Sequence, residues 1–589
     1  MVMDAITSQV IRQYLETVSI EMSTTIERTS VHPLFNETHD YSTGVFYAEG
    51  VNVDLVARST AIPVHIFASL MSVSHMLDGY AADLYDGDVV ILNDPYYGGT
   101  HSADWTVMRC VELEGGGMLF PSVRGHMADC GGPSPGGYNP SAREVWQEAF
   151  RLAPIKLVER GRRRLDIQRL ILANTRIPDV LEGDLDAMVA ACEVATNRIT
   201  ELVGKYGVEA VRTGVADSLD YSERRIRAEV SKWPDGDYVG TALLDHDSAG
   251  SRDIKVVSTL TVSGSDLIFD FDGSASQTPG FINSPWANTA SYVYSALCAA
   301  IPDDIPVNSG LFRAVSIEAP LGTVVNPIQP AAVMATTGRI GGEIGTAVMK
   351  SLEHVAPERV GAIAFGGSLC TSFGHDPRYD EFYVTIEYGN NLAAAGASHG
   401  VDGWGGWPTP FSTLVFNTIE MMEIQFPFLY HEYEFTTDTA AAGQWRGLPA
   451  FSMVREARWD DQFVNLIIEG VRNRAPGWVG GSESGENQMW IARGDQPAIP
   501  VIESATRLEM SAGDRLQSLR FGGGGWGDPL TRDPEAVRTD VIDDIYSIPA
   551  AERLFGVVIV PATSLVDVDE TNRLRESMRS GVEPVASTV

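Results

Sequence analysis

The sequence predicts an α+β protein of several subdomains, with mixed and antiparallel sheets. The chain has 589 residues, several times the usual size of one domain. Its first third alternates short apolar runs with stretches of helical periodicity, and a hairpin pattern follows near the middle. Shifts in composition indicate how the chain divides. We expect an N-terminal region over 1–234, a central α+β region with antiparallel hairpins over 235–440, a β-rich C-terminal region with a glycine-rich loop over 441–565, and a polar tail over 566–589.

Periodic apolar residues predict the first elements. Ile11, Leu15, Val18, Met22 and Ile26 recur at helical spacing, which favours an amphipathic helix. Beyond it, short apolar runs bounded by turn residues indicate strands. The expected elements are a helix over 5–28, strands over 44–48 and 51–56, a helix over 67–80 and a strand over 88–92.

The later elements follow from the same two periodicities. Apolar residues from Leu185 to Leu202 recur every three or four positions and predict a helix over about 182–204. Residues 254–262 and 267–272 are apolar runs joined by a short polar turn, which predicts an antiparallel hairpin. The chain then mixes strands, short helices and glycine-rich turns up to about residue 560. The final residues are polar and predict a loosely held tail.

Composition excludes several classes of function. The formal charge is 43 minus 78, or −35, which disfavours binding to nucleic acid or to an anionic membrane surface. The start of the chain has no basic segment before an apolar core, and no stretch reaches the roughly 18 apolar residues of a membrane span. The five cysteines are far apart and form no CxxC pair, which argues against disulfides and a cysteine zinc site. We therefore expect a soluble, cytoplasmic protein in a reducing compartment.

Histidines and aspartates cluster in the N-terminal region. Six of the eleven histidines fall within the first 126 residues. His101 and Asp104 are three residues apart, and His126 follows at the end of an expected strand. With Asp40, these residues offer two imidazoles and two carboxylates, a set that suits Mn²⁺, Zn²⁺ or Fe²⁺ better than Ca²⁺. A metal held there would act as a Lewis acid and activate water.

The same residues have a simpler interpretation. Histidines in loops are often held by ordinary hydrogen bonds, and aspartate is common in turns. The spacing HxxD followed distantly by a further histidine is a loose pattern, so spacing alone leaves both interpretations open.

Other motifs point to chemistry less directly. The sequence contains no GxxxxGK[ST] phosphate-binding loop, no GxGxxG between a strand and a helix, and no GxSxG elbow, so any nucleotide must bind by another fold or on another chain. Residues 521–529 form a glycine-rich run that either contacts a ligand or makes a turn. Residues 336–343 either bind an anion at a helix N-terminus or cap that helix. Residues 399–407 are aromatic and glycine-rich, either a pocket wall or part of a core.

Motifs spread along the chain resemble the hydantoinase B/5-oxoprolinase family. The resemblance covers roughly residues 5–560 in order, which is far more specific than any single motif. The matching segments are Asn-Asp-Pro-Tyr-Tyr-Gly-Gly-Thr-His at 93–101, Arg-Gly-His-Met-Ala-Asp at 124–129, Ile-Leu-Ala-Asn-Thr-Arg at 171–176, Phe-Asp-Gly-Ser at 271–274, Pro-Val-Asn-Ser-Gly at 306–310, Gly-Gly-Gly-Gly-Trp-Gly-Asp-Pro at 522–529, Tyr-Ser-Ile-Pro-Ala-Ala-Glu-Arg at 546–553 and Phe-Gly-Val-Val at 555–558.

The resemblance implies a hydantoinase B-like fold and a division of labour between subunits. In the family, an A-type subunit binds ATP and Mg²⁺, and the B-type subunit carries a divalent metal and the substrate chemistry. The resemblance implies metal ligands at Asp40, His101, Asp104 and His126, with Asp104, His126 and Asp129 as catalytic residues and Asn93, Asp94 and Arg124 around the substrate.

One segment departs from the family pattern. Many members carry Arg-x-Asp-Phe-Ser where this chain has Thr-His-Asp-Tyr-Ser at 38–42, so the aspartate is kept and its basic neighbour is changed. His39 is therefore the alternative ligand to Asp40.

The resemblance leaves the reaction open among related possibilities. The leading hypothesis is a hetero-oligomeric, ATP-dependent hydrolase of cyclic amides such as hydantoins, lactams or 5-oxoproline. The second is a subunit of an ATP-dependent ketone carboxylase of the acetone or acetophenone type, and the third is a non-catalytic scaffold subunit.

Overall fold

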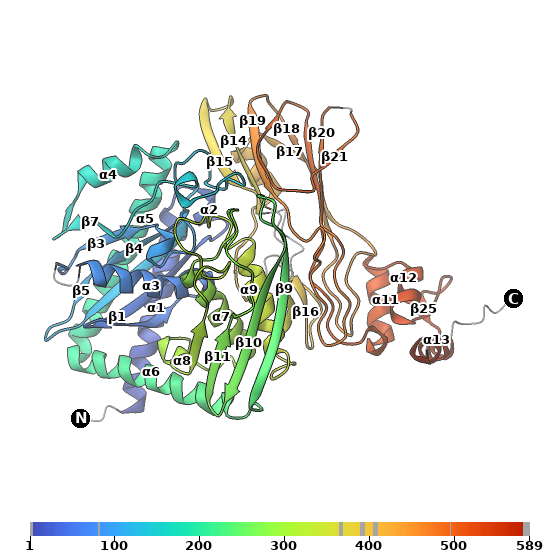
Figure 1. Cartoon of the computed structure of the whole chain (residues 1–589), viewed down its shortest axis with the longest axis horizontal. Coiled ribbons are helices and arrows are strands. Elements are labelled where there is room, and N and C mark those ends of the chain that lie inside the picture. The colour runs from blue at the N-terminus through green and yellow to red at the C-terminus, as the bar shows by residue number, and fades with distance from the viewer. Residues whose placement is uncertain are drawn as a thin grey trace.

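The computed structural model describes residues 4–80, 83–363, 369–388, 395–404, 410–494 and 496–580. It is an α+β fold in which helices pack between and around several sheets (Figure 1). None of the described helices is long and apolar enough to cross a membrane. The α+β class and the combination of mixed and antiparallel sheets are confirmed.

An antiparallel sheet in the N-terminal region carries the predicted ligands. Its strands follow the order β2-β1-β6-β4-β3-β7-β8, and β5 pairs with β6. The strands are β1 (Tyr41–Glu49), β2 (Asn52–Arg58), β3 (Val89–Leu92), β4 (Asp104–Arg109), β5 (Val111–Glu112), β6 (Met118–His126), β7 (Ile155–Glu159) and β8 (Arg162–Arg163).

Long helices cover this sheet. The helix α1 (Ala5–Thr29) packs on β1 and β2, α5 (Pro178–Tyr206) packs on β4 and β6, and both contact α6 (Val208–Val230). The Asp4 carboxylate caps α1 by accepting from the backbone N–H of Ile6 and Thr7. The apolar stripe that predicted α1 is buried along its whole length. The expected helices over 5–28 and 182–204 are therefore confirmed.

Helices also join this sheet to the next one. The helix α3 (Pro63–Tyr80) contacts α7 (Trp286–Ala300), α7 contacts α9 (Ile340–Leu352), and α9 packs on β9 and β10 (Figure 1). The second sheet has the order β12-β11-β10-β9, from β9 (Gly236–His246), β10 (Arg252–Ser263), β11 (Asp266–Asp270) and β12 (Val315–Glu318). The predicted hairpin is confirmed as β10 and β11, and β11 runs parallel to β12.

The C-terminal region contains facing sheets around a separate buried cluster. One sheet has the order β15-β14-β19-β22 and the other β17-β18-β23-β20-β21. Buried residues from both meet in one cluster that includes Cys370, Met453, Leu466 and Leu516. The strands are β14 (Leu369–Asp376), β15 (Glu381–Ile386), β17 (Phe428–Phe435), β18 (Phe451–Ala457), β19 (Gln462–Ile467), β20 (Gln488–Ala492), β21 (Ile499–Pro500), β22 (Ala505–Met510) and β23 (Arg515–Arg520).

A buried ion pair links these facing sheets. The Glu387 carboxylate accepts from Arg455 Nε at 2.7 Å and Nη2 at 2.6 Å, and both side chains are buried. We expect Glu387→Gln to lower the free energy of unfolding by about 3 kcal/mol, because it leaves the buried guanidinium without its counter-charge. Urea unfolding measures this loss. The matched control is Glu483→Gln, whose partner Arg474 is exposed; a loss above about 1 kcal/mol in the control, or none in Glu387→Gln, contradicts the assignment.

The chain ends in a small helical unit at one end of the molecule (Figure 1). It contains α11 (Pro534–Ile542), α12 (Ile548–Phe555), β24 (Ile559–Val560), β25 (Leu565–Val566) and α13 (Val568–Ser580). The expected polar tail is thus helical over 568–580, where the Arg575 guanidinium donates to the Phe555 carbonyl and fixes α13 to α12. The shorter elements are α2 (Pro33–Asn36), α4 (Leu165–Leu172), α8 (Ser309–Phe312), α10 (Ile419–Gln425), β13 (Gly361–Ile363) and β16 (Ala395–Ser398).

The predicted division of the chain at 234/235 falls between α6 and β9. The main buried cluster nevertheless includes residues on both sides of it, such as Leu185 and Val256. The regional boundaries therefore stay a prediction about sequence organisation.

Candidate metal centre

Strand pairing brings the predicted ligands to one end of the N-terminal sheet. Asp104 is the first residue of β4 and His126 the last of β6, and the two are direct partners across these strands. Asp40 immediately precedes β1, and its carbonyl accepts from the His126 backbone N–H at 3.0 Å. His101 lies in the loop just before β4. Residues separated by up to 86 positions, 40 to 126, are thus aligned by the hydrogen-bonding register of neighbouring strands.

The Asp104 carboxylate is the centre of the cluster. It lies 3.4 Å from His101 Nε2 and 3.2 Å from His126 Nδ1. A further histidine, His65, lies with Nε2 3.2 Å from the same carboxylate. His126 Nδ1 also lies 3.9 Å from the Asp40 carboxylate. His101, Asp104 and His126 each offer one ligand atom, and these three atoms lie within 4.8 Å of one another. One ion can bridge this spacing.

The electrostatics of His101 and Asp104 favour the forms that bind metals. Burial raises the pKa of Asp40, and Asp104 and Asp40 together outweigh burial and raise the pKa of His126, so these two groups must lose a proton when an ion binds. Burial lowers the pKa of His101 to about 3, against the opposing effect of Asp104, so its imidazole is neutral at pH 7. Burial alone would raise the pKa of Asp104, but His101, His65 and His126 outweigh it and hold that pKa well below the usual range. Neutral imidazoles and ionised carboxylates are the required ligand forms. The buried His126 Nε2 has no hydrogen-bond partner among the described residues, so the donor set fits a borderline divalent ion.

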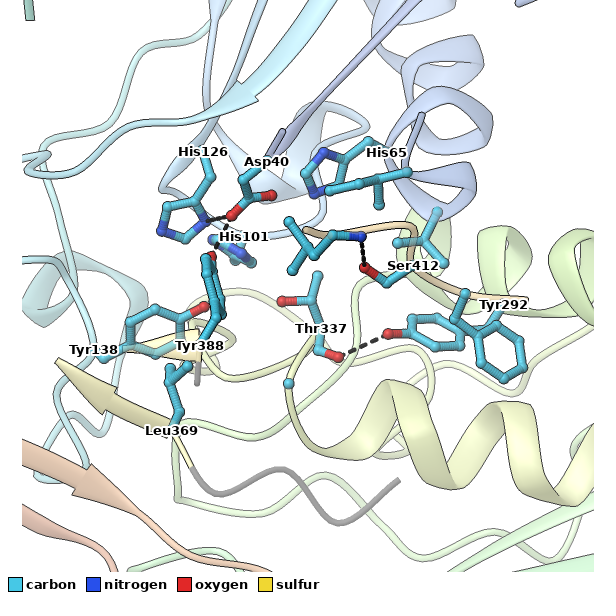
Figure 2. A pocket seen from close by; sticks show the side chains of 15 residues that line it. Asp40, His65, His101, His126, Tyr138, Tyr292, Thr337, Leu369, Tyr388 and Ser412 are labelled. Atoms are coloured by element: carbon cyan, nitrogen blue, oxygen red, sulfur yellow. Dashed lines mark hydrogen bonds and ion pairs between the residues drawn. The ribbon is translucent and has the colours of Figure 1, made fainter. Parts of the chain in front are cut away.

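The cluster opens onto a small buried cavity. The water-accessible volume is about 50 Å³, and Asp40, His65, His101 and His126 gather at one end of it (Figure 2). The Tyr388 hydroxyl donates a hydrogen bond to the Asp40 carboxylate. The described lining is completed by Ile62, Val64, Tyr138, Tyr292, Thr337, Gly338, Leu369, Phe411, Ser412 and Leu414.

His39, the alternative to Asp40, lies outside this cavity. Its ring is half exposed, and Nδ1 lies 4.0 Å from the Glu27 carboxylate. The backbone of His39 has φ of 56°, and its neighbour Asp40 is buried. The geometry supports Asp40 over His39.

Arg124 and Asn93 lie behind the cluster and do not line the cavity. The Arg124 guanidinium donates to Thr106 Oγ1, Ser72 Oγ and the carbonyls of His65 and Gly98, so it ties α3 to the sheet. The Asn93 amide donates to the Ser102 carbonyl at 2.8 Å and holds the loop that carries His101. Both side chains position ligands and have no contact with the cavity.

Asp94 and Asp129 are also engaged elsewhere. Asp94 caps the short helix η1 (Pro95–Tyr97) and pairs with Arg151 at 2.5 Å. The Asp129 carboxylate accepts from the backbone N–H of Gly136 and Arg176 and pairs with the Arg176 side chain at 3.0 Å. The structure therefore does not bring Asp129 or Asp94 to the predicted catalytic and substrate positions; each fixes a loop.

Sequence reasoning missed several residues of the site. His65 lies in the first turn of α3, which begins at Pro63 and not at residue 67 as expected; proline at a helix start was the signal available. Tyr138 stacks on the His126 ring, with centroids 5.9 Å apart and an interplanar angle of 9°. Tyr388 reaches the site from far along the chain, and no local pattern marks it.

The remaining sequence motifs differ in whether they line the cavity. Thr337 and Gly338, just before α9, line the cavity. Residues 521–529 lie away from it, and the backbone packs so closely that a Cβ at Gly525 would lie 2.1 Å from the Ala442 carbonyl oxygen. His399 packs against Trp445 and Trp526, while residues 405–407 of that motif lie outside the described residues.

The fold and the cluster together define an α+β protein with a buried histidine–aspartate centre at one end of a sheet. The family model for hydantoinase B/oxoprolinase matches residues 4–529, and the chain belongs to this family. It is 34% identical to the caprolactamase subunit beta of Pseudomonas jessenii over 94% of this chain and 96% of that subunit. The crystal structure of the ATP-dependent caprolactamase from Pseudomonas jessenii aligns with a TM-score of 0.90 at 32% identity, over 98% of this chain and 100% of that one. A nucleotide-free acetone carboxylase aligns with a TM-score of 0.89 at 18% identity, over 100% and 84%, and shares the fold.

Proposed function

We propose that this chain is the metal-binding, catalytic B-type subunit of an ATP-dependent hydrolase of cyclic amides. The observation that carries the proposal is the buried cluster of His101, Asp104 and His126 beside a small cavity, in a chain of the hydantoinase B/oxoprolinase family. The name of the caprolactamase relative specifies both a lactam and a subunit. We infer that ATP and Mg²⁺ bind to a hydantoinase A-type partner, because the sequence contains no phosphate-binding loop.

Asp40, His101, Asp104 and His126 would hold the ion, which we propose to be Mn²⁺, Zn²⁺ or Fe²⁺. When bound, such an ion supplies Lewis-acid chemistry, which polarises a carbonyl and activates water. The chain's own residues define the geometry. Tyr388 orients the Asp40 carboxylate through its hydrogen bond, and the Tyr138 ring fixes the plane of the His126 imidazole.

The reaction needs ATP because an unstrained amide resists attack by water. In the proposed scheme, ATP and the partner subunit phosphorylate the amide oxygen, and water then adds to the carbonyl carbon. The C–N bond breaks and the nitrogen takes a proton, which leaves an acyl phosphate. A second water hydrolyses it, so that a lactam yields an amino acid, ADP and phosphate.

Ketone carboxylation is the second candidate, supported by the fold shared with acetone carboxylase.

The test uses the chain co-purified with its A-type partner and supplied with lactams, hydantoins or ketones, each with and without ATP and bicarbonate. We expect ring opening that requires ATP and is unchanged by bicarbonate. Ketone consumption that requires bicarbonate would establish the carboxylase. Full activity of the complex when this chain contains well under one metal ion per chain would support the scaffold role.

A further inference from the structure

His65 is a third imidazole at the metal centre, and the proposed ligand set does not use it. It is buried in the first turn of α3, and Figure 2 shows it beside Asp40 among the side chains that line the cavity. The backbone of His65 is fixed, because its carbonyl accepts from Arg124 Nη1 at 3.3 Å and from Ser69 Oγ at 3.0 Å. The ring therefore approaches the centre from a firmly held turn of helix.

The two oxygens of the Asp104 carboxylate have different surroundings. Oδ2 accepts a hydrogen bond from the Thr100 hydroxyl, and His65 Nε2 lies 3.2 Å from the same oxygen. His101 Nε2 lies farther from it, at 3.4 Å. Oδ1 is buried, has no hydrogen-bond partner among the described residues and lies 3.2 Å from His126 Nδ1. Because a buried oxygen without a partner is costly, Oδ1 is the oxygen that remains for an ion.

The contacts of the His65 ring decide which of its nitrogens carries the proton. Nδ1 is buried without a partner among the described residues, whereas Nε2 faces the ionised Asp104 carboxylate. A proton on Nδ1 would leave a buried N–H unpaired and would set two lone pairs against each other. A proton on Nε2 makes a charge-assisted hydrogen bond instead. His65 Nε2 is therefore a donor to Asp104 and is not free to bind an ion.

We propose that His65 is a positioning residue of the metal centre: together with Thr100 it holds Asp104 Oδ2, so that Oδ1 alone binds the ion and one coordination position stays open for substrate. The inference rests on the metal-binding part of the proposed function and specifies how that centre is kept incomplete. A carboxylate released by these donors can turn and bind an ion through both oxygens. It would then fill the position that a catalytic site leaves open. His65 thus acts through Asp104.

Removing the His65 donor at similar volume tests the proposal on the ion itself. The complex with the A-type partner is loaded with Zn²⁺, and we expect His65→Leu to keep its zinc. X-ray absorption at the zinc edge should find one more oxygen ligand in this variant than in the wild type. The kcat for ATP-dependent ring opening should fall about 10- to 100-fold. His65→Gln, whose amide nitrogen can donate to Asp104, should restore the wild-type coordination.

A second variant and a matched control make the test specific. Thr100→Val removes the other donor to Asp104 Oδ2 and should add an oxygen ligand in the same way. Either variant alone suffices if circular dichroism shows that the other has unfolded. The control is His75→Leu on the same helix, because His75 Nδ1 lies 2.9 Å from the Met71 carbonyl and the ring does not line the cavity. It should leave zinc coordination and kcat at the wild-type values.

The results separate this inference from the proposed function. Unchanged zinc coordination in His65→Leu would overturn the inference. Loss of zinc from that variant, to the level of His101→Ala, would also overturn it, because His65 would then be a ligand. Neither result contradicts the hydrolase. A zinc-loaded complex that opens no cyclic amide with ATP would instead overturn the proposed function, and the coordination of zinc in His65→Leu would still decide the inference.

Discussion

Replacing Asp104 by asparagine should abolish metal binding and lower ATP-dependent ring opening by at least ~1,000-fold. The Asp104 carboxylate contacts His65, His101 and His126, so it is both a ligand and the charge that organises the imidazoles. Asparagine keeps the size and shape of the side chain and removes its negative charge. Metal content by elemental analysis and the rate of lactam opening by the complex measure the two effects.

Asp129→Asn is the matched control for this substitution. Asp129 is equally buried, but its carboxylate fixes the backbone at Gly136 and Arg176 and does not face the cavity. We expect it to lower the free energy of unfolding by about 1–3 kcal/mol while the folded protein keeps its metal. A full complement of metal in Asp104→Asn, or its loss only in Asp129→Asn, would contradict the assignment.

We expect Gly98→Ala to have the largest effect on stability, because the added methyl group meets the backbone of α3. The free energy of unfolding should fall by about 5 kcal/mol, or the chain should fail to fold. Gly98 has φ of 89°, and a Cβ there would lie 2.4 Å from Ser72 N and 2.5 Å from the Met71 carbonyl carbon. The contact can be relieved only by moving α3 from the loop, which breaks the bonds of Arg124 to Gly98 and Ser72. His65 lies on the same helix, so the metal site should weaken too. Thermal and urea unfolding check the stability.

Gly50→Ala separates backbone strain from steric overlap. Gly50 also has positive φ, at 64°, but a Cβ there meets nothing within 4 Å. We expect a loss of about 1 kcal/mol from strain alone. Similar losses in the two variants would show that close packing at Gly98 is not what holds the helix to the loop.

The sequence predicts much of the fold because several elements are locally determined. The α1 stripe and the β10–β11 hairpin follow from periodicities of 3.6 and 2 that their own residues carry. The spacing of His101 and Asp104 is likewise a local feature of the sequence. Their convergence with Asp40 and His126 depends on strand pairing, so the spacing alone leaves it open, and the family resemblance is what favours it.

Residues that are close in sequence need not be close in space where the chain changes direction. Asp129 lies three residues beyond His126 in one motif, yet β6 ends at His126 and the following turn directs the Asp129 carboxylate toward Arg176. Tyr388 and Thr337 reach the cavity through long-range packing, which leaves no local pattern to read.

Elemental analysis of the purified chain, beside His101→Ala and His126→Ala and co-expressed with the A-type partner, tests the metal centre most directly. We expect about one Mn, Zn or Fe ion per wild-type chain and less than about one tenth of that in both variants, with circular dichroism unchanged. Wild-type protein purified without chelator that contains no metal, or variants that keep the full amount, would contradict the account.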